Sequence, residues 1–140
     1  MTSEVRSGLK PGARGSDFCF ACGMANESGL RMKIVPFEDG CRTVFTPLRR
    51  HQGYDDAVHG GILATLLDEV IVWAGRFQGF DIVTAELVVR YKKPVLIDTP
   101  VEVFGRITGG RGRLVLGQSR ITDPGGALLA TAHGKFIRIS

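Results

Sequence analysis

Beyond residue 80 the chain alternates hydrophobic and polar residues with a period of two, the pattern of strands that bury one face. The segments between these stretches are rich in proline, glycine and aspartate, which favour turns. The pattern therefore predicts four long strands, at residues 82–92, 101–108, 113–122 and 127–139.

Residues 61–77 follow a different period and predict the one strong helix. Hydrophobic residues recur at the 3.6-residue spacing of an α-helix, at positions 63, 66, 67, 70 and 74. Positions 62, 71, 72 and 73 are hydrophobic as well, which is typical of a buried helix. Gly79 supplies the signal that ends it.

Two shorter strands are predicted before this helix. Residues 30–37 alternate in polarity, a turn follows, and residues 41–46 return to complete a hairpin. The predicted order is ββαββββ, an α+β fold in which one antiparallel sheet wraps around a single long helix. One sheet leaves part of such a helix uncovered, and a second copy would cover it. Residues 1–17 are polar and predict a flexible tail, followed by one domain at residues 18–140.

Composition narrows the classes of partner. The net charge is +4, but lysine and arginine are scattered and aromatic residues make up only 8% of the chain, which disfavours a nucleic-acid-binding surface. A small ligand that carries phosphates fits the same excess of positive charge. We find neither a signal peptide nor a hydrophobic stretch long enough to cross a bilayer, so we expect a cytoplasmic protein with no membrane partner.

Three cysteines in such a chain argue against a disulfide framework. Cys19 and Cys22 form a C-x-x-C motif, which is half of a zinc site. Only Cys41 and His51 are available to complete four ligands. Because the motif is half-complete, ordinary thiols are favoured over a metal, and no metal or other cofactor is expected.

The start of the helix, His59-Gly60-Gly61, is the first candidate for chemistry. Two glycines expose backbone N–H groups to a ligand, and the positive end of the helix dipole favours a developing negative charge there. These are the requirements of an oxyanion-stabilising site. Taken alone, an ordinary glycine-rich helix start is the favoured interpretation of this motif.

Asp68 and Glu69 form the only acidic pair in this helix. Burial of a carboxylate is costly, and it raises the pKa towards a range that suits a general base. We expect Glu69 to face solvent or to bond a nearby backbone group, which leaves Asp68 as the catalytic candidate. Nine residues of helix place Asp68 about 13 Å from His59, too far to act on a carbonyl held at its own helix start. If the two features cooperate, the site must be shared between two chains with antiparallel helices.

The helix motif, residues 59–69, resembles the H-G-G-x-x-x-x-x-x-D signature of hotdog thioesterases of the PaaI-like group, named after the phenylacetate pathway. Residues 83–87 and 90–95 resemble the strand and proline turn that follow the helix in that family. The segment that begins C-F-A-C-G at Cys19 resembles a marker of one of its subgroups. The resemblance covers roughly residues 18 to 139.

The resemblance implies hydrolysis of acyl-CoA thioesters by a homodimer or a dimer of dimers. It implies that Asp68 activates water or attacks the thioester carbonyl, and that the Gly60 N–H of the partner chain polarises that carbonyl. His59 would orient the thioester, Thr84 would help to position the water, and Gly61 would contact the substrate. Family members often carry Asn or Gln in the loop before the histidine, and here Gln52 or His51 is available for that role.

Two basic clusters are expected to bind the phosphates of CoA, although solvated strand ends are an equally good interpretation of any one residue. Their members are Arg90, Lys92, Lys93, Arg111 and Arg113. Two other functions stay open: a hotdog acyl-thioester dehydratase, and a non-catalytic acyl-CoA-binding domain. The His-Gly-Gly helix start disfavours the first, and an intact Asp68 weakly disfavours the second.

Overall fold

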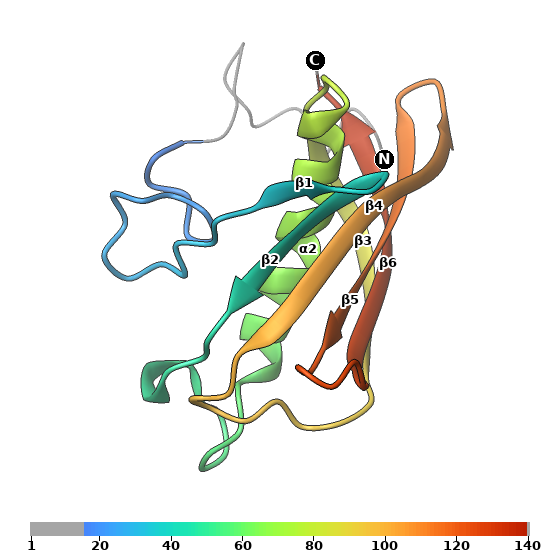
Figure 1. Ribbon diagram of the computed structural model, residues 1–140. Coiled ribbons are helices and arrows are strands. Elements are labelled where there is room, and N and C mark those ends of the chain that lie inside the picture. Colours follow the sequence, from blue (N-terminus) through green and yellow to red (C-terminus); the bar gives the residue numbers. More distant parts are fainter. Residues whose placement is uncertain (1–15, 140) are drawn as a thin grey trace.

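A computed structural model describes residues 16–139, and it contains one long helix against a six-stranded sheet (Figure 1). The predicted tail, residues 1–17, lies outside the described residues except for its last two positions. The elements in chain order are β1 (Val35–Phe37), β2 (Gly40–Phe45), the 3-10 turn η1 (Arg49–His51), α2 (Gly60–Phe77), β3 (Ile82–Tyr91), β4 (Val101–Arg111), β5 (Leu114–Thr122) and β6 (Leu128–Arg138).

The strands form one antiparallel sheet in the order β1-β2-β4-β5-β6-β3, and α2 lies against one face of it (Figure 1). The order ββαββββ and the hotdog architecture predicted from the sequence are therefore confirmed. Because β3 follows the helix but pairs only with β6, it forms an edge of the sheet. This places the strand that follows the Asp68 helix at the border of the molecule.

The core lies between α2 and the sheet. Leu66, Leu67 and Ile71 on the helix are fully buried, as are Ile121 and Phe136 on the strands. Burial of each such side chain stabilises the fold by about 1.5–3 kcal/mol. The helix and sheet approach closely because β4 has a glycine at the crossing point.

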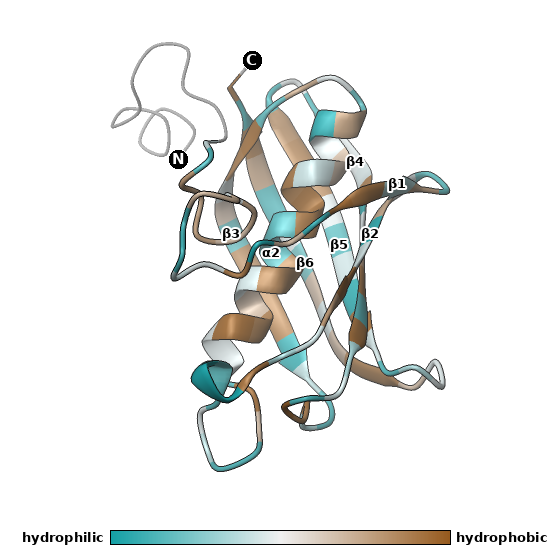
Figure 2. Cartoon of the chain, turned by 60° about the vertical axis from the view of Figure 1, so that its left-hand side comes forward, coloured by the Kyte–Doolittle hydropathy of each residue, from teal (hydrophilic) through white to brown (hydrophobic). Residues whose placement is uncertain are grey.

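That glycine is Gly105. A Cβ there would lie 2.5 Å from the Val70 carbonyl oxygen, so only a residue without a side chain fits. The side of α2 that faces away from the sheet is less well covered. Ile62, Val72 and Trp73 are half-buried, and Figure 2 shows one hydrophilic band in the middle of an otherwise mostly hydrophobic helix.

Two strand boundaries differ from the prediction by more than one residue. The strand predicted at residues 30–37 is regular only from Val35, because the N–H groups of Leu30 and Met32 donate to the carbonyls of Phe20 and Ala21. These residues extend along the N-terminal loop and not along the sheet, although their alternation in polarity is the same. The strand predicted at 101–108 runs on to residue 111, through an irregularity in the pairing of β4 with β5.

The helix matches its prediction closely. It begins one residue earlier than expected, at Gly60, and ends at Phe77 just before Gly79, which has a φ of 97°. In the part of the chain that the structure describes, no helix is both long and hydrophobic enough to span a membrane.

Candidate functional site

Asp68 lies at the middle of α2, on the side that faces β3. Its carboxylate is half-buried, and Oδ1 accepts a hydrogen bond of 2.7 Å from the hydroxyl of Thr84. The two residues that the sequence assigned to activation and positioning of water are thus in direct contact. One oxygen of the carboxylate is fixed by Thr84, and such a bond holds the group in one orientation.

The environment of Asp68 raises its pKa above the usual value for an aspartate. Burial is the main cause, the nearby charge of Glu69 adds to it, and the hydrogen bond from Thr84 acts in the opposite direction. A carboxyl whose pKa is shifted upward is a better general base than a fully solvated one.

A β-bulge in β3 aims Thr84 at the helix. Thr84 pairs with Phe136 and Glu86 pairs with Lys135, so Ala85 is an extra residue on β3. In a regular strand, with Ala85 paired like its neighbours, Thr84 would point to the same face as Glu86, which is exposed. The bulge reverses the face, so that Thr84 reaches Asp68.

The helix start has a defined hydrogen-bond pattern. His59 is the N-cap of α2, and its Nδ1 accepts from the Gly61 N–H at 2.8 Å. In a neutral imidazole the proton then lies on Nε2, which makes Nε2 a donor towards solvent. The Gly61 N–H, predicted to contact substrate, is thus already engaged, whereas Gly60 is the first helical residue and its N–H has no acceptor within the helix.

Tyr91 joins the end of β3 to this helix start. Its hydroxyl donates to the Gly60 carbonyl at 2.9 Å, and a Cβ at position 60 would lie in ordinary van der Waals contact with its ring, at 3.4 Å. Tyr91 was not singled out from the sequence, although it stands inside the segment R-Y-K-K-P that the family resemblance includes. The contact fixes the distance between the Gly60 amide and the edge strand.

Gln52 and His51, the two residues considered for the assisting role, are held in different ways by the loop before the helix. The backbone carbonyl of His51 accepts from the His59 N–H at 2.8 Å, so residue 51 holds the helix start through its main chain. Its ring is buried, and Nδ1 accepts from the Leu48 N–H at 2.9 Å. Gln52 Oε1 accepts from the Asp56 N–H at 3.3 Å, within the same loop. Both side chains therefore stabilise the loop in this single chain.

The basic residues predicted to bind phosphates fall at two ends of the sheet. Lys92 and Lys93 follow Tyr91 near the helix start, and both N–H groups donate to the Leu129 carbonyl. Arg111 and Arg113 flank the β4–β5 turn, which lies at the other end of α2 (Figure 1). One chain does not bring the two groups together.

A groove of about 610 Å³ is lined mostly by residues on the face of the sheet opposite α2, and none of Asp68, Thr84, His59 and Gly60 lines it. Of the predicted phosphate-binding residues only Arg90 does. The groove is therefore separate from the residues of the candidate site.

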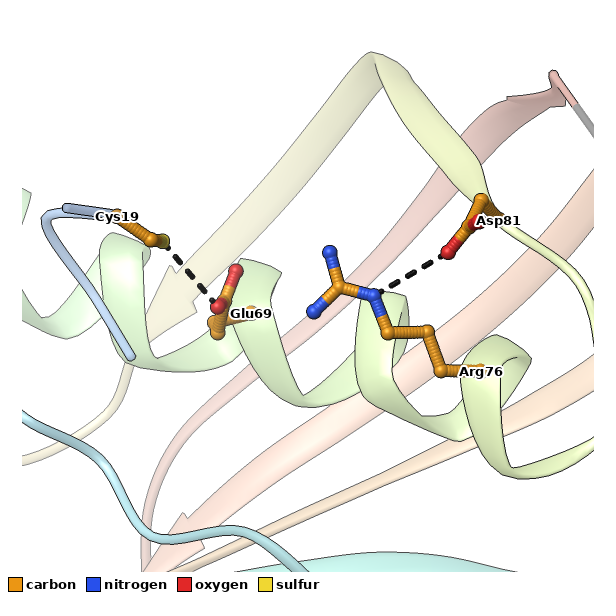
Figure 3. A network of polar contacts seen from close by, with 4 residues as sticks. All are labelled: Cys19, Glu69, Arg76 and Asp81. Atoms are coloured by element: carbon orange, nitrogen blue, oxygen red, sulfur yellow. Dashed lines mark hydrogen bonds and ion pairs between the residues drawn. The ribbon is translucent and has the colours of Figure 1, made fainter. Parts of the chain in front are cut away.

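The structure contradicts the prediction that Glu69 faces solvent or bonds a nearby backbone group. Its side chain is 8% exposed, and it accepts a bond of 3.5 Å from the Cys19 thiol (Figure 3). Ligand atoms of Cys19, Cys22 and Glu69 all lie within 4.8 Å of one another. The pKa of the Cys22 thiol is raised to about 12, and burial is the largest cause. A hydrogen bond with Glu69 and the negative charge of Glu69 act in the same direction.

Cys41 and His51 do not join this cluster among the described residues. The Cys41 thiol is buried under α2 and donates to the Val70 carbonyl at 2.9 Å. The set of four ligands considered from the sequence is therefore not assembled, and a carboxylate that the sequence did not link to the cysteines stands beside them.

Comparison with known proteins places the chain in a family. Residues 56–130, more than half of the chain, match the family model described as Thioesterase superfamily. The search of curated proteins finds no match. Among solved structures, a thioesterase superfamily protein with 25% identity superposes with a TM-score of 0.82, over 86% of this chain and 60% of its own. The chain thus spans about three-fifths of that protein.

Two further structures share the fold. The Escherichia coli PaaI protein from the phenylacetic acid degradation operon is 19% identical, with a TM-score of 0.73 over 79% of this chain and 81% of its own. The smu.793 protein of Streptococcus mutans, solved with acetyl-CoA, is 21% identical, with a TM-score of 0.72 over 78% and 89%. The family match, the strand order and the single buried helix agree with the PaaI-like resemblance, and the chain belongs to the thioesterase superfamily.

Proposed function

We propose that this protein hydrolyses acyl-CoA thioesters to a free acid and CoA. Asp68 is the group that activates water or attacks the thioester carbonyl, and the Gly60 N–H of a second copy polarises that carbonyl. The observation that carries the proposal is the half-buried Asp68 carboxylate, held by Thr84 at 2.7 Å with a raised pKa, in a chain of the thioesterase superfamily. The structure of the Streptococcus mutans protein with bound acetyl-CoA supports CoA as the thiol part of the substrate.

A second copy is required because the two halves of the site lie on one helix but far apart. Gly60 and Asp68 are eight residues apart, about 12 Å along the axis. The free edge of β3 offers the place for the second copy, since an edge strand has unpaired backbone groups. Two β3 strands related by a two-fold axis would pair antiparallel and extend the sheet across both chains.

The bulge selects the register of that pairing. With Ala85 left out of the count, Thr84 occupies the position next to Glu86 and shares a face with Tyr91. A two-fold axis at Val88 then sets Thr84 opposite Tyr91 of the second copy. Since Thr84 binds Asp68 and Tyr91 binds Gly60, this register brings the carboxylate of one chain to the helix start of the other.

Charge supports the same register. On the outer face it places Glu86 opposite Arg90 of the second copy, and opposite charges directly across an antiparallel pair are favourable. Both side chains are exposed in the single chain. In this dimer Arg90 forms part of the interface. The CoA phosphates are then bound by Lys92 and Lys93 of one chain and by Arg111 and Arg113 of the other.

Cross-linking tests the axis directly. Val88 is 39% exposed, and in this register a cysteine at position 88 faces its own copy. We expect Val88→Cys to form a disulfide-linked dimer on mild oxidation. Arg90→Cys is the matched control, because its copies are about 13 Å apart along the strands. Equal cross-linking of both variants, or a fully active monomer, would contradict the shared site.

Mixed dimers test the catalytic pairing. Gly60→Pro removes the N–H at the first helical position, where proline is well tolerated, and the φ of −59° and ψ of 134° at His59 suit a residue before proline. Each of Gly60→Pro and Asp68→Asn should be inactive alone. After unfolding and refolding together, random pairing should restore about a quarter of wild-type activity, because half of the dimers contain one intact site. No recovery would place both groups in the same chain's site.

The reaction itself is tested by release of free thiol from a panel of acyl-CoAs. We expect turnover of at least one acyl-CoA, and a higher KM when Lys92, Lys93, Arg111 or Arg113 is changed to Ala. The corresponding acyl-pantetheine lacks the CoA phosphates, so its KM should not change. Hydration of an enoyl-CoA without thiol release would indicate the dehydratase, and binding without either reaction would indicate the acyl-CoA-binding domain.

A further inference from the structure

We propose that Cys19, Cys22 and Glu69 bind one Zn²⁺ ion, which fastens the N-terminal loop, residues 18–29, to the centre of helix α2. The site is separate from the proposed catalytic carboxylate and does not depend on it.

The three side chains converge from two elements. The cysteines come from the loop and Glu69 comes from the helix, and Figure 3 shows Cys19 and Glu69 pointing towards each other. The three ligand atoms lie within 4.8 Å of one another. In a tetrahedral site with Zn–S bonds of about 2.3 Å the sulfur atoms stand roughly 3.8 Å apart, so the ligands need to close by about 1 Å. Two thiolates with a carboxylate form a borderline-soft set that suits Zn²⁺ better than Mg²⁺ or Ca²⁺.

The indole of Trp73 gives an independent indication. Its Nε1 is buried and makes no hydrogen bond of full geometry among the described residues, but it lies close enough to the Cys22 sulfur to act against the rise in the pKa of that thiol. Trp73 lies one helical turn after Glu69 and lines the same hollow as Cys22. A metal-bound thiolate at Cys22 would accept this N–H, whereas a protonated thiol is a weak acceptor. The buried donor gains a full acceptor once Cys22 has lost its proton to a metal.

Electrostatics favours a cation at this place. Among residues 16–139 the buried Glu69 forms no ion pair with a basic side chain, and Arg76, one turn beyond Trp73, is paired with Asp81 at 3.3 Å (Figure 3). Zinc is bound by thiolates, so its binding releases the thiol protons, and the divalent charge offsets the buried carboxylate.

The loop is folded into the shape that brings both thiols to one side. Gly23 closes the turn after the second cysteine, with its N–H on the Cys19 carbonyl at 2.9 Å. A Cβ at Gly23 would collide with the Asp17 carbonyl and the Cys19 nitrogen, so the turn requires glycine. Asn26 fixes the far side of the loop by donating to the Phe18 carbonyl at 3.1 Å.

Of the three ligands, Cys22 lines an open hollow of about 390 Å³, whose lining also includes Asp17 and Trp73. A water molecule from this hollow completes the site. A disulfide between Cys19 and Cys22 is the competing use of the same motif, but it would use neither the Glu69 carboxylate nor the Trp73 N–H.

Metal content of the full-length chain tests the proposal. We expect one equivalent of zinc per chain, by elemental analysis after dialysis in the presence of reductant, and competition with a chromophoric chelator for its affinity. Cys22→Ser and Glu69→Gln should weaken zinc binding, the first by on the order of 100-fold, and Trp73→Phe by about 10-fold. Cys41→Ser is the matched control and should bind zinc as the wild type does.

Cobalt gives a second readout that does not require a variant. Co²⁺ in place of zinc should show thiolate-to-metal absorption and should quench the fluorescence of Trp73, the only tryptophan of the chain. The proposal is overturned if the reduced wild type binds no stoichiometric zinc or if Cys41→Ser loses as much affinity as Cys22→Ser. A purified chain that carries a Cys19–Cys22 disulfide, and binds no zinc after reduction, would overturn it in favour of a redox pair.

Discussion

Asp68 and Glu69 are neighbours in the chain, yet α2 turns them towards different parts of the molecule. Successive residues of a helix point about 100° apart, so Asp68 faces the edge strand β3 while Glu69 faces the N-terminal loop. The first is half-buried and meets a hydroxyl donor, and the second is buried and meets two thiols. Two carboxylates of similar chemistry thus acquire different uses from what the fold sets opposite each.

The comparison shows that burial by itself does not identify a catalytic acid. Glu69 is the more deeply buried of the two, but its neighbours are ligands suited to a metal. Asp68 is half-buried, and in the proposed dimer a second copy brings the amide of a helix start to it. What lies opposite the carboxylate, and whether substrate can reach it, distinguishes the two.

Of the changes to the two carboxylates and their surroundings, Asp68→Asn should have the largest effect. The amide keeps the size of the side chain and accepts from Thr84, but it is neither a base nor a nucleophile. We expect kcat to fall by about two to four decades with the fold retained. Thiol release with the best acyl-CoA and circular dichroism measure the two effects, and exposed Asp98→Asn is the control. Near-wild-type turnover of Asp68→Asn would remove Asp68 from the mechanism.

A change on the sheet-facing side of the same helix should act on stability. Gly105→Ala places a Cβ against the backbone of Val70, two residues beyond Asp68, and backbone atoms cannot give way easily. We expect a loss of about 2–3 kcal/mol in the free energy of unfolding, measured by urea denaturation. Gly109→Ala on the same strand has open space for the methyl group and should cost less. Equal stability of the two variants would contradict the close approach of helix and sheet.

Thr84→Val tests whether the hydrogen bond from Thr84 to Asp68 contributes to catalysis. Valine has the shape of threonine without the donor, so the carboxylate loses its 2.7 Å bond and its fixed orientation. Loss of one such bond corresponds to about 1.5 kcal/mol, or roughly a tenfold lower kcat. Thr84→Ser should retain most of the activity because it keeps the hydroxyl. If Val and Ser lower kcat equally, the hydroxyl is not what matters.

The smallest expected effect concerns His51, which supports the helix start. Burial, followed by the charge of Arg50, lowers the pKa of this imidazole below its unfolded value near 6.5. As the pH falls through that value, the unfolded chain binds a proton that the folded chain does not, so stability decreases. The slope is at most about 1.4 kcal/mol per pH unit. Denaturation at pH 7.5 and 5.5 should show a smaller difference for His51→Asn, and an unchanged difference would exclude this contribution.

The helix and the order of the strands could be predicted because their signals are local. The 3.6-residue period before Gly79 placed the helix within one residue, and the spacing from His59 to Asp68 located the candidate acid. Residues 30–34 could not be distinguished from a strand, since alternation in polarity does not say which carbonyls receive their N–H groups.

The surroundings of Glu69 could not be predicted for a different reason. Its partner Cys19 is 50 residues away in the sequence, and only the folded loop brings the two together. The contact between Asp68 and Thr84 depends on a bulge that no residue type announces, because Ala85 is ordinary in a strand. The family resemblance supplied Thr84 where local pattern could not.

The extra residue in β3 has a consequence for how this chain tolerates insertions and deletions. Removal of Ala85 would leave the pairing partners on both sides unchanged, with Thr84 opposite Phe136 and Glu86 opposite Lys135. The sheet would regain an unbroken ladder, and the hydroxyl at position 84 would still lie on the face opposite to Glu86, towards Asp68, because neighbouring residues of a strand point to opposite faces. A single gap at this position in a sequence comparison therefore does not by itself signal the loss of the contact between Thr84 and Asp68.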